Sequence, residues 1–360
     1  MTPAEELSAV VASLKPDRAV IVTDSNVRPI AEEYISAVGS VVPAGVFILP
    51  PGEQGKSLEQ LASLAAFMSQ SGLSRNSLVV NIGGGCVSDL GGFAAAVFKR
   101  GVRTVNVATT ILAAVDAAIG GKTAVDFLGL KNQLGAFHIP ERVIIADDLL
   151  RHLPREEYLS GLGEVLKTAM LDSRELYLEV LKDCGRSMER PYTPENSDCS
   201  DKADWAEKFA GIISRCAEFK EEVVRRDPEE KGLRRILNLG HTAGHAFEAL
   251  AARKGDAVSH GTAVAHGLLV SLILSHIKCG FPSLSIYPYR ELLQKLYRRL
   301  PVKCSDAEAL ADIMRHDKKN TSGTAFNFVL LRDFGVPEEC VPVSKEELLG
   351  ALDIYCDMMG

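Results

Sequence analysis

The sequence predicts a protein of two parts, a Rossmann-like α/β half built on a parallel sheet and an all-α half. In the first part, apolar β-branched runs alternate with segments of helical periodicity, which is the pattern of βαβ units. From Pro154 onward the periodicity is helical nearly throughout. We therefore predict one domain over residues 1–152 and a second over residues 153–360.

The first half is predicted to open with a helix and then to alternate strands and helices. Each expected strand is a short apolar run that ends in turn residues, and each expected helix has apolar residues three and four apart. The expected strands are 18–27, 46–54, 77–85 and 141–150, a further strand ends within 105–110, and the expected helices are 4–14, 30–40, 57–72 and 89–98. Such a sheet is covered on both faces and binds ligands beyond the carboxyl ends of its strands.

The second half has the pattern of consecutive helices with one polar interruption. The expected helices are 156–171, 203–226, 236–252, 261–278, 289–300, 307–319 and 345–355. Residues 184–202 are rich in serine, proline and charge, and we interpret them as an exposed loop without a chemical role.

Composition limits the class of protein. With 360 residues, 46% of them hydrophobic and 24% charged, the chain is expected to be globular with a substantial core. Polar residues interrupt its apolar runs, so we expect no membrane span, and its first residues lack the pattern of a secretory signal. The eight cysteines include no CxxC pair, which predicts reduced thiols and a cytoplasmic location. A net charge of −7 disfavours nucleic acid as a partner.

Residues suited to a nucleotide follow three of the predicted strands. They are Asp24 and Asn26 after the first strand, Glu53 and Lys56 after the second, and Gly83, Gly84 and Gly85 after the third. The glycine run precedes a predicted helix, so backbone N–H groups and the helix N-terminus suit a pyrophosphate. The run departs from the dinucleotide fingerprint at Ser88, and the usual acidic residue about 20 positions later is absent. We predict nucleotide binding, with a structural glycine turn as the alternative.

A glycine-rich stretch over 105–137 carries side chains suited to a small anion. Its GGKT sequence is not a P-loop, because Asp116 stands where that motif requires glycine. Asp116, Lys122, Lys131 and Asn132 remain as candidate contacts to an anionic substrate. The alternative for each lysine is a solvated loop position. That alternative is weakest for Lys122, because two preceding glycines let the backbone approach a ligand closely.

Two histidines four residues apart, His241 and His245, are expected on one face of the predicted helix 236–252. Arg234 and Asn238 have the same spacing just upstream. The glutamate of an HExxH protease is absent, so a metal site would need ligands from elsewhere in the chain. The alternative is a pair of structural histidines.

Further metal ligands are available in the second half. Glu164 and His260, together with His241, would provide the two histidines and one carboxylate found in many catalytic zinc sites. Lys167 is expected one turn after Glu164 on the same helix face. Spacing alone does not select this set. The competing ligands are His245, Glu248 and His266.

Long motifs over nearly the whole chain are similar to those of the 3-dehydroquinate synthases, a family of the sugar-phosphate cyclase superfamily. They occur in this order with natural spacing: LPPGEQGKSLE, GGGCVSDLGGFAAAVFKRG, VATTILAAVDAAIGGKTAVD, LKNQLGAF, GLGEVLK, FKEEVVRRDPEEKGLRRILNLGHTAGHAFE, HGTAVAHG and MRHDKKNTSG. Several unusual motifs in register make the resemblance specific. It implies an NAD-binding α/β domain, a helical domain, a site in the cleft between them, and a homodimer.

The resemblance also implies roles for individual residues. The implied metal ligands are Glu164, His241 and His260, with zinc as the expected metal and cobalt as the alternative. The implied NAD contacts are Asp24, Asn26, Glu53, Lys56, Gly83, Gly84, Gly85, Asp89, Thr109, Thr110, Lys122 and Lys131. The implied catalytic residues are Lys122, Lys167, Lys220, Arg234, Asn238 and His245. The implied substrate contacts are Arg100, Asp116, Lys131, Asn132, Glu230, Lys318 and Lys319.

The implied reaction belongs to the shikimate pathway of aromatic amino acid biosynthesis and converts 3-deoxy-D-arabino-heptulosonate 7-phosphate to 3-dehydroquinate and phosphate. In this family NAD oxidises one ring carbon transiently, phosphate leaves by β-elimination, the hydride returns, and an intramolecular aldol addition closes the carbocycle. The substrate carries a carboxylate and a phosphate. An acidic protein must therefore gather its lysines and arginines locally to bind it.

Some positions depart from the family pattern, namely Ser88, Ala108, Ala243 and Thr262. They leave open a sister cyclase that forms an aminodehydroquinate, deoxy-inosose or valiolone ring. Two further alternatives are an alcohol dehydrogenase of the glycerol dehydrogenase type and a homologue without activity that is retained for binding. Together, Lys220, Arg234, Asn238 and His245 favour the dehydroquinate reaction, because they suit a substrate with a carboxylate.

Overall fold

The computed structural model describes residues 1–128, 130–186, 199–315 and 325–360. The chain divides into two compact units. The first comprises Met1–Pro154 and Asp198–Glu221, and the second comprises Arg155–Ser197 and Glu222–Gly360. The domain boundary predicted from the sequence, at residues 152 and 153, stays a prediction.

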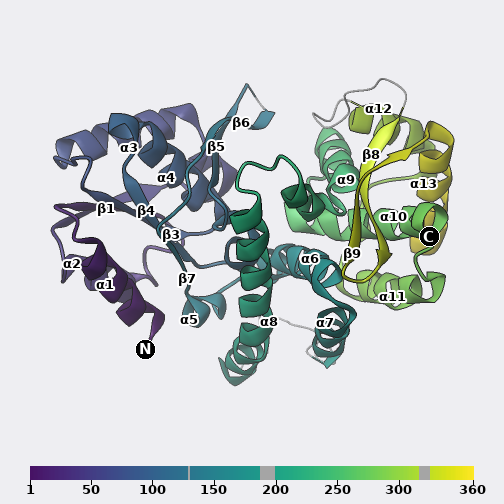
Figure 1. Ribbon diagram of the computed structural model, residues 1–360, viewed down its shortest axis with the longest axis horizontal. Coiled ribbons are helices and arrows are strands. Elements are labelled where there is room, and N and C mark those ends of the chain that lie inside the picture. The colour runs from purple at the N-terminus through teal and green to yellow at the C-terminus, as the bar shows by residue number, and fades with distance from the viewer. Residues whose placement is uncertain (129, 187–198, 316–324) are drawn as a thin grey trace. The chain divides into compact units, whose positions relative to one another are not determined.

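The first unit is built on a five-stranded parallel sheet (Figure 1). Its order is β2 (Ala44–Leu49), β1 (Ala19–Asp24), β3 (Leu78–Gly83), β4 (Arg103–Ala108) and β7 (Arg142–Ile145). Its helices are α1 (Pro3–Leu14), α2 (Glu32–Gly39), α3 (Leu58–Gln70), α4 (Gly85–Val97) and α5 (Asp147–Leu150). This confirms the predicted Rossmann-like α/β half.

Apolar side chains of the central strands alternate between two cores, as the period of two in a strand requires. Ile21 and Val80 belong to the core that includes residues of α1 and α2. Val20 and Val79 belong to the core that includes residues of α3 and α4. Because helices cover both faces, the carboxyl edge of the sheet is the part open to a ligand.

The glycine-rich stretch after β4 contains structure that the sequence did not predict. A π-helical turn, η3 (Ala113–Ala117), is followed by a hairpin of β5 (Lys122–Phe127) and β6 (Leu130–Phe137). The register of this hairpin shifts between Val125 and Phe127. π-helical turns are rare and occur often at functional sites, so this turn favours a functional role for the stretch.

The second unit is mainly helical (Figure 1). Its helices are α6 (Arg155–Asp172), α7 (Arg174–Arg186), α9 (His241–Arg253), α10 (His260–Cys279), α11 (Ile286–Leu296), α12 (Ala307–Arg315) and α13 (Lys345–Met359). α8 (Cys199–Arg226) is counted with the first unit up to Glu221.

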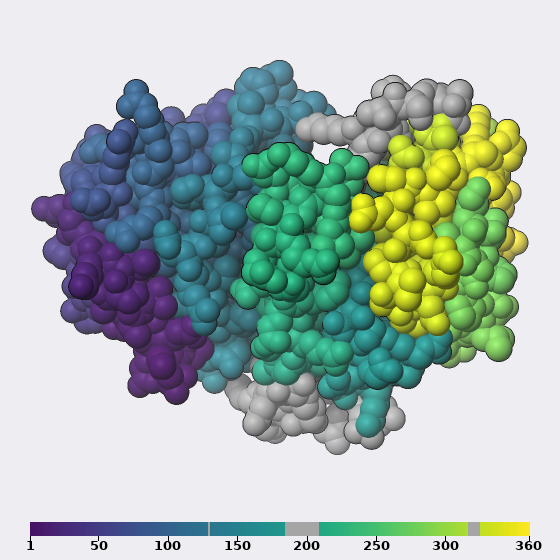
Figure 2. Space-filling model, viewed as in Figure 1, coloured from purple at the N-terminus to yellow at the C-terminus, as the bar shows by residue number. Residues whose placement is uncertain are grey.

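Two corrections apply to the predicted all-α half. β8 (Phe326–Asp333) and β9 (Val336–Val343) form an antiparallel hairpin that packs on α10 and lies at the surface in Figure 2. The expected helix 236–252 is also interrupted. Its start is a 3₁₀ turn, η5 (Leu233–Asn238), and Gly240 has a φ of +79°, so the α-helix begins only at His241.

α10 is the core helix of the second unit, with buried residues from Gly261 to Ser275. By length and composition it could span a membrane, which corrects the expectation that its apolar run is too short or too polar. However, 78% of its most apolar window is buried within the protein, as in core helices generally.

Glycines let α10 touch two neighbouring helices through its backbone. A Cβ atom on Gly261 would lie 1.7 Å from Ser160 O, and one on Gly163 would lie 2.2 Å from Gly261 O, so α6 and α10 are in backbone contact. A Cβ atom on Gly267 would lie 2.1 Å from Gly240 O and 2.6 Å from Gly244 N, which brings the start of α9 against α10. Any side chain at these positions would push the helices apart.

We predict that Gly261→Ala lowers the free energy of unfolding by about 3 kcal/mol, because the added methyl group meets backbone atoms that have no room to move. Gly350→Ala in α13 is the control, since a Cβ atom there would meet no atom within 4 Å. The control should change stability by less than about 1 kcal/mol. Urea unfolding measures both, and equal stability of the two variants would contradict the packing described.

A buried histidine of α10 predicts how stability depends on pH. His266 is fully buried; its Nδ1 lies 2.8 Å from Tyr355 Oη and its Nε2 lies 3.1 Å from Arg298 O. A neutral imidazole satisfies both partners by donating to the carbonyl and accepting from the hydroxyl. Burial lowers the pKa of His266 to about 4, and the contact with Arg298 offsets only part of this effect.

The pKa of His266 is thus depressed on folding, so its neutral form contributes stability that is fully present above about pH 6.5 and is lost as the pH falls toward 4. Between pH 7 and pH 5 the protein should lose about 2 kcal/mol through this residue. Urea unfolding of the native chain and of His266→Gln at both values checks this. The same change with pH in both proteins would contradict it.

Candidate functional site

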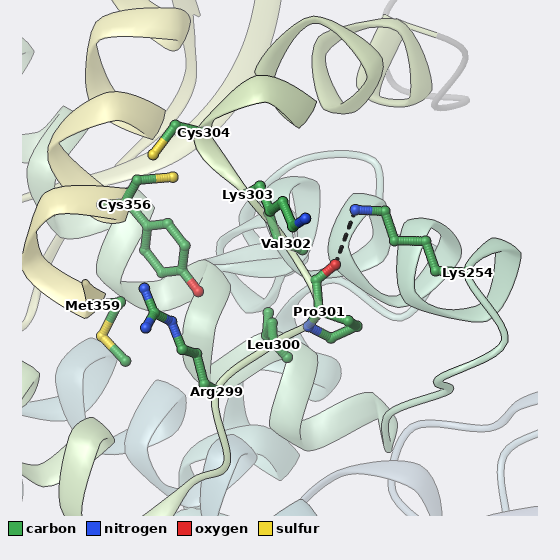
Figure 3. A pocket seen from close by; sticks show the side chains of 10 residues that line it. Lys254, Arg299, Leu300, Pro301, Val302, Lys303, Cys304, Cys356 and Met359 are labelled. Carbon is green, nitrogen blue, oxygen red and sulfur yellow. Dashed lines mark hydrogen bonds between the residues drawn. The ribbon is translucent and has the colours of Figure 1, made fainter.

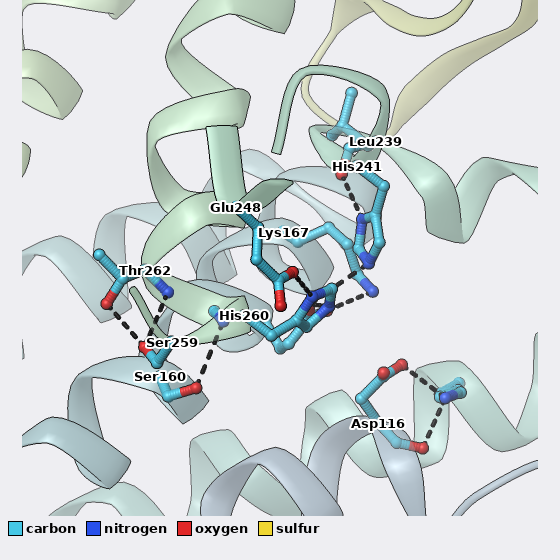
Figure 4. A network of polar contacts seen from close by, with 12 residues as sticks. Asp116, Ser160, Lys167, Leu239, His241, Glu248, Ser259, His260 and Thr262 are labelled. Atoms are coloured by element: carbon cyan, nitrogen blue, oxygen red, sulfur yellow. Dashed lines mark hydrogen bonds and ion pairs between the residues drawn. The ribbon is translucent and has the colours of Figure 1, made fainter. Parts of the chain in front are cut away.

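Three predicted metal ligands meet in the second unit, and two of them, His241 and His260, are labelled in Figure 4. His241 and His260 are the first residues of α9 and α10, and Glu164 lies within α6, fully buried. Glu164 Oε1 lies 3.4 Å from His241 Nε2 and 3.5 Å from His260 Nε2. Each ligand is next to a glycine of the helix contacts, so the backbone contacts of the three helices set these distances.

Hydrogen bonds on the other edges of both imidazoles orient the rings. His241 Nδ1 lies 3.2 Å from Leu239 O, and His260 Nδ1 lies 3.1 Å from Glu248 Oε2. In both rings Nδ1 is therefore engaged outside the cluster, and Nε2 is directed toward Glu164.

A third imidazole, that of His245, lies close to the same cluster. Its ring centroid is 5.4 Å from that of His241 and 5.6 Å from that of His260, and the nearest ring nitrogens of the three histidines lie within 4.8 Å of one another. His241 and His245 therefore share one helix face as predicted. Geometry offers both Glu164 and His245 as companions to His241 and His260, so the role of His245 is taken up as a proposal below.

The electrostatics of the cluster suit a cation. Burial lowers the pKa of His241 well below its usual value, so this imidazole is neutral, as a metal ligand must be. Burial also acts to lower the pKa of His260, but Glu164 and Glu248 outweigh it and raise the pKa to about 10. The carboxylates thus attract positive charge to this point. Two imidazole nitrogens and a carboxylate oxygen fit a divalent metal of the zinc type.

Lys167 lies beside these ligands and forms an ion pair with Glu164 Oε2. Its side chain is almost completely buried, at 2% exposure. The predicted placement one turn after Glu164 is therefore observed. Pairing with Glu164 offsets part of the cost of burying the ammonium beside the predicted ligands.

The loop between α8 and α9 presents three further predicted residues. Arg234 is buried and its Nη1 donates to Pro228 O at 2.7 Å, whereas Asn238 Nδ2 donates to Glu230 Oε1 at 3.0 Å. The Asp227 carboxylate accepts the backbone N–H groups of residues 231, 232 and 234. Asp227 was missed from the sequence, although an Asp-Pro pair followed by glycine is a turn signal. It shapes the turn that holds Arg234.

The predicted nucleotide contacts gather at the carboxyl edge of the sheet in the first unit. Gly83 ends β3, Gly84 is the N-cap of α4, and Gly85 is its first residue. No side chain caps this helix, and its first turn has no acidic residue, so the N–H groups of the turn suit a pyrophosphate. Thr109 N donates to Gly83 O, and the buried Thr109 hydroxyl has no hydrogen-bond partner among the described residues. A bound nucleotide would supply one.

Two further predicted NAD contacts, Asp24 and Thr110, accept backbone hydrogen bonds in turns. Asp24 Oδ1 accepts the backbone N–H groups of Asn26 and Val27, which fixes the turn after β1. Thr110 Oγ1 accepts the N–H of Ala113 at 3.1 Å at the start of the next turn. Both side chains therefore shape the backbone at the carboxyl edge, close to the glycine run.

Two lysines near this edge are paired with carboxylates. Buried Lys56 lies 2.5 Å from Asp89, and Lys131 lies 3.2 Å from Glu53 in η1 (Gly52–Gly55). Burial raises the pKa of Asp89 to about 6 in spite of the lysine. The charges of the Lys56–Asp89 pair are therefore largely shielded from solvent.

The π-helical turn aims Asp116 at α8. Lys220 Nζ donates to both the backbone oxygen and Oδ1 of Asp116, each at 2.5 Å. Lys122 begins β5, and Asn132 has a φ of +54° while its N–H donates to Asp126 Oδ1. The charged residues predicted in this stretch therefore lie on the turn and hairpin that the sequence did not predict.

Of the remaining predicted substrate contacts, one is placed elsewhere in the first unit and two lie outside the described residues. Arg100 precedes β4, at the amino edge of the parallel sheet, opposite to the edge that carries Gly84 and Thr109. Its role stays a prediction without support from placement. Lys318 and Lys319 lie outside the described residues.

A cavity of about 750 Å³ in the second unit does not coincide with the histidine cluster (Figure 3). Lys254, Arg299, Cys304 and Cys356 are among its lining residues. Lys254 is engaged by Pro301 O at 3.0 Å and by Asp306. The residues that line this cavity do not include the convergent ligands Glu164, His241 and His260.

Comparison with known proteins gives the family. Residues 46–160 match the model described as 3-dehydroquinate synthase N-terminal, and residues 161–320 match 3-dehydroquinate synthase C-terminal. The chain is 39% identical over 355 residues to a 3-dehydroquinate synthase of Parabacteroides distasonis, covering 99% of this chain and 96% of the relative. It is also 39% identical over 365 residues to one of Thermococcus kodakarensis, covering 99% and 95%.

Solved structures agree on the fold. One is 2-deoxy-scyllo-inosose synthase with carbaglucose-6-phosphate, NAD⁺ and Co²⁺, at a TM-score of 0.80 and 24% identity, covering 97% of this chain and 94% of the other. Another is 2-epi-5-epi-valiolone synthase of Streptomyces hygroscopicus with NAD⁺ and Zn²⁺, at 0.78 and 24%, covering 94% and 91%. At these identities the structures show the fold alone, whereas the family models and the relatives confirm the resemblance seen in the motifs. The chain belongs to the 3-dehydroquinate synthase family.

Proposed function

We propose that the protein converts 3-deoxy-D-arabino-heptulosonate 7-phosphate to 3-dehydroquinate and phosphate, as an NAD- and metal-dependent lyase. The observation that carries this proposal is the convergence of His241, His260 and Glu164 with buried Lys167 beside them. It occurs in a chain whose relatives over nearly full length are 3-dehydroquinate synthases.

We propose that Glu164, His241 and His260 hold a divalent metal, with zinc expected and cobalt as the alternative. The Co²⁺ and Zn²⁺ of the two related cyclases support this choice. When bound, such a metal polarises adjacent hydroxyl groups and lowers the pKa of the one to be oxidised. Lys167 balances the charge of Glu164, and the Nδ1 hydrogen bonds keep both Nε2 lone pairs directed inward.

The first unit supplies the proposed NAD contacts. Gly84 and Gly85 offer N–H groups at the start of α4, and the Thr109 hydroxyl offers a buried donor. Asp24 fixes the turn after β1, where Asn26 is exposed. When bound, NAD supplies reversible hydride acceptance, so it is used without net consumption. The NAD⁺ of both related structures supports this assignment.

Cationic side chains are proposed to bind the substrate anions. The chain has a net charge of −7, so an anion is attracted only where lysines and arginines are concentrated. Lys122, Lys131 and Lys220 lie on or against the hairpin and π-helical turn, while Lys167 and Arg234 lie in the second unit. Guanidinium and ammonium donors suit carboxylate and phosphate oxygens.

We assign proton handling at the substrate hydroxyls to the His245 imidazole. It is exposed while its neighbour His241 is buried, so the two histidines of the motif have different surroundings. Asn238, held by Glu230, is proposed to orient the same substrate groups. An exposed imidazole close to the proposed metal ligands suits a general acid–base role.

The departures from the family pattern are accommodated locally. Ser88 Oγ donates to Gly85 O at 3.0 Å within α4, and Thr262 Oγ1 accepts from the N-cap residue Ser259 at 2.9 Å. Ala243 is fully buried. None of these contacts removes a proposed ligand or cation. The preference for the dehydroquinate reaction over the sister cyclases rests on Lys220, Arg234, Asn238 and His245.

We also propose a cytoplasmic location and a homodimer, without nucleic acid or membrane partners. The six cysteines whose side chains the structure describes are free thiols, as expected in a reducing compartment. The negative net charge argues against binding nucleic acid.

The proposal is tested by incubating the purified protein with the heptulosonate phosphate, NAD and zinc. We expect phosphate and the cyclic product to appear in equal amounts, to require NAD, and to form without accumulation of NADH. Steady accumulation of NADH would instead indicate an alcohol dehydrogenase. Equal turnover of a sugar phosphate without a carboxylate would indicate a sister cyclase.

A further inference from the structure

We infer that Glu248 is a positioning residue of the metal centre, which holds the His260 imidazole so that Nε2 is presented to the metal. This inference rests on the metal site proposed above and goes beyond the ligand set. Glu248 Oε2 lies 3.1 Å from His260 Nδ1, on the edge of the ring opposite to Glu164 (Figure 4).

The helical repeat explains how Glu248 reaches this position. His241, His245 and Glu248 are spaced by four and three residues, so all three lie along one face of α9. That face is turned toward the start of α10, where His260 is the first helical residue after the N-cap Ser259. One helix face thus carries a proposed ligand, a proposed proton-transfer residue and the carboxylate that contacts the second histidine ligand.

His260 needs such support more than His241 does. The His241 side chain is 10% exposed, and a backbone carbonyl, Leu239 O, engages its Nδ1. The His260 side chain is 31% exposed and belongs to the first residue of α10. A carboxylate on Nδ1 fixes the tautomer with the lone pair on Nε2 and makes that nitrogen a stronger donor to a metal.

Glu248 is better placed to orient His260 than to act as a ligand itself. The sequence left Glu248 open as a competing ligand. In the structure it contacts the Nδ1 edge of the ring, whereas the cluster with Glu164 is on the Nε2 edge. A carboxylate cannot share a metal with Nε2 while it accepts from Nδ1 of the same ring, because the two nitrogens face different directions.

The test compares zinc affinity among Glu248→Ala, Glu248→Gln and the wild-type protein, by competition with a chelating dye. We expect zinc binding to weaken about 10- to 100-fold in the alanine variant. The glutamine variant should lose less than about 10-fold, because its amide oxygen still accepts the Nδ1–H group. Glu291→Ala in α11, an exposed glutamate of the same unit, is the matched control and should bind zinc as the wild type does.

Urea unfolding of the metal-free variants separates positioning from general stability. A positioning role predicts that the glutamine variant unfolds at the wild-type midpoint while its zinc affinity is measurably reduced. Wild-type zinc affinity in Glu248→Ala would overturn the inference. A glutamine variant that loses zinc affinity and whose metal-free form also unfolds at a lower urea concentration than the wild type would overturn it as well. Failure of the wild-type protein to bind zinc or cobalt would overturn the metal site itself and this role with it.

Discussion

The backbone contact of α6, α9 and α10 is the constraint on which the candidate metal centre depends. Gly163 and Gly261 bring α6 against α10, and Gly240, Gly244 and Gly267 bring α9 against it. The proposed ligands Glu164 and His260 are direct neighbours of these glycines in the chain, and His241 follows Gly240. Helices normally pack about 8–10 Å apart, with side chains between them. Here the missing side chains let ligands from three helices converge.

A second theme is that buried cations are paired with carboxylates. Lys56 pairs with Asp89, Lys167 with Glu164, and Lys220 with Asp116, and all three lysines are buried. Burying such a pair costs desolvation energy that its attraction often only balances, so ion pairs of this kind are weak evidence for stability. Their placement beside the glycine loop, the metal ligands and the π-helical turn is better explained by binding an anionic substrate and cofactor.

Much of the architecture could be predicted from the sequence, because strong local patterns specify it. The alternating apolar strands predicted the parallel sheet, and the helix expected over 89–98 is α4, which begins four residues earlier at Gly85. The two hairpins were missed because β6 and β9 have few buried residues and lack the alternating apolar pattern of a half-buried strand. β8 is an apolar run that periodicity alone cannot distinguish from a helix. η5 was read as helix because one 3₁₀ turn followed by Gly240 leaves little trace in the helical pattern.

The candidate site was less predictable than the fold. Spacing predicted that His241 and His245 share a helix face, but it did not select Glu164 over Glu248 or His266 as a metal ligand. Ligands from three helices meet only after folding. The structure separates them: His266 is buried against Tyr355, Glu248 contacts the outer edge of His260, and Glu164 lies at the Nε2 atoms. The resemblance implied a substrate contact for Arg100, which precedes β4 at the amino edge of the sheet, and this role stays a prediction.

The central claim is that the two imidazoles and one carboxylate form a single metal centre, and zinc K-edge X-ray absorption of the zinc-loaded protein tests it most directly. The account predicts a first shell of nitrogen and oxygen with multiple scattering from two imidazoles. A sulfur shell, or scattering from three imidazoles with His245 in the place of Glu164, would contradict it.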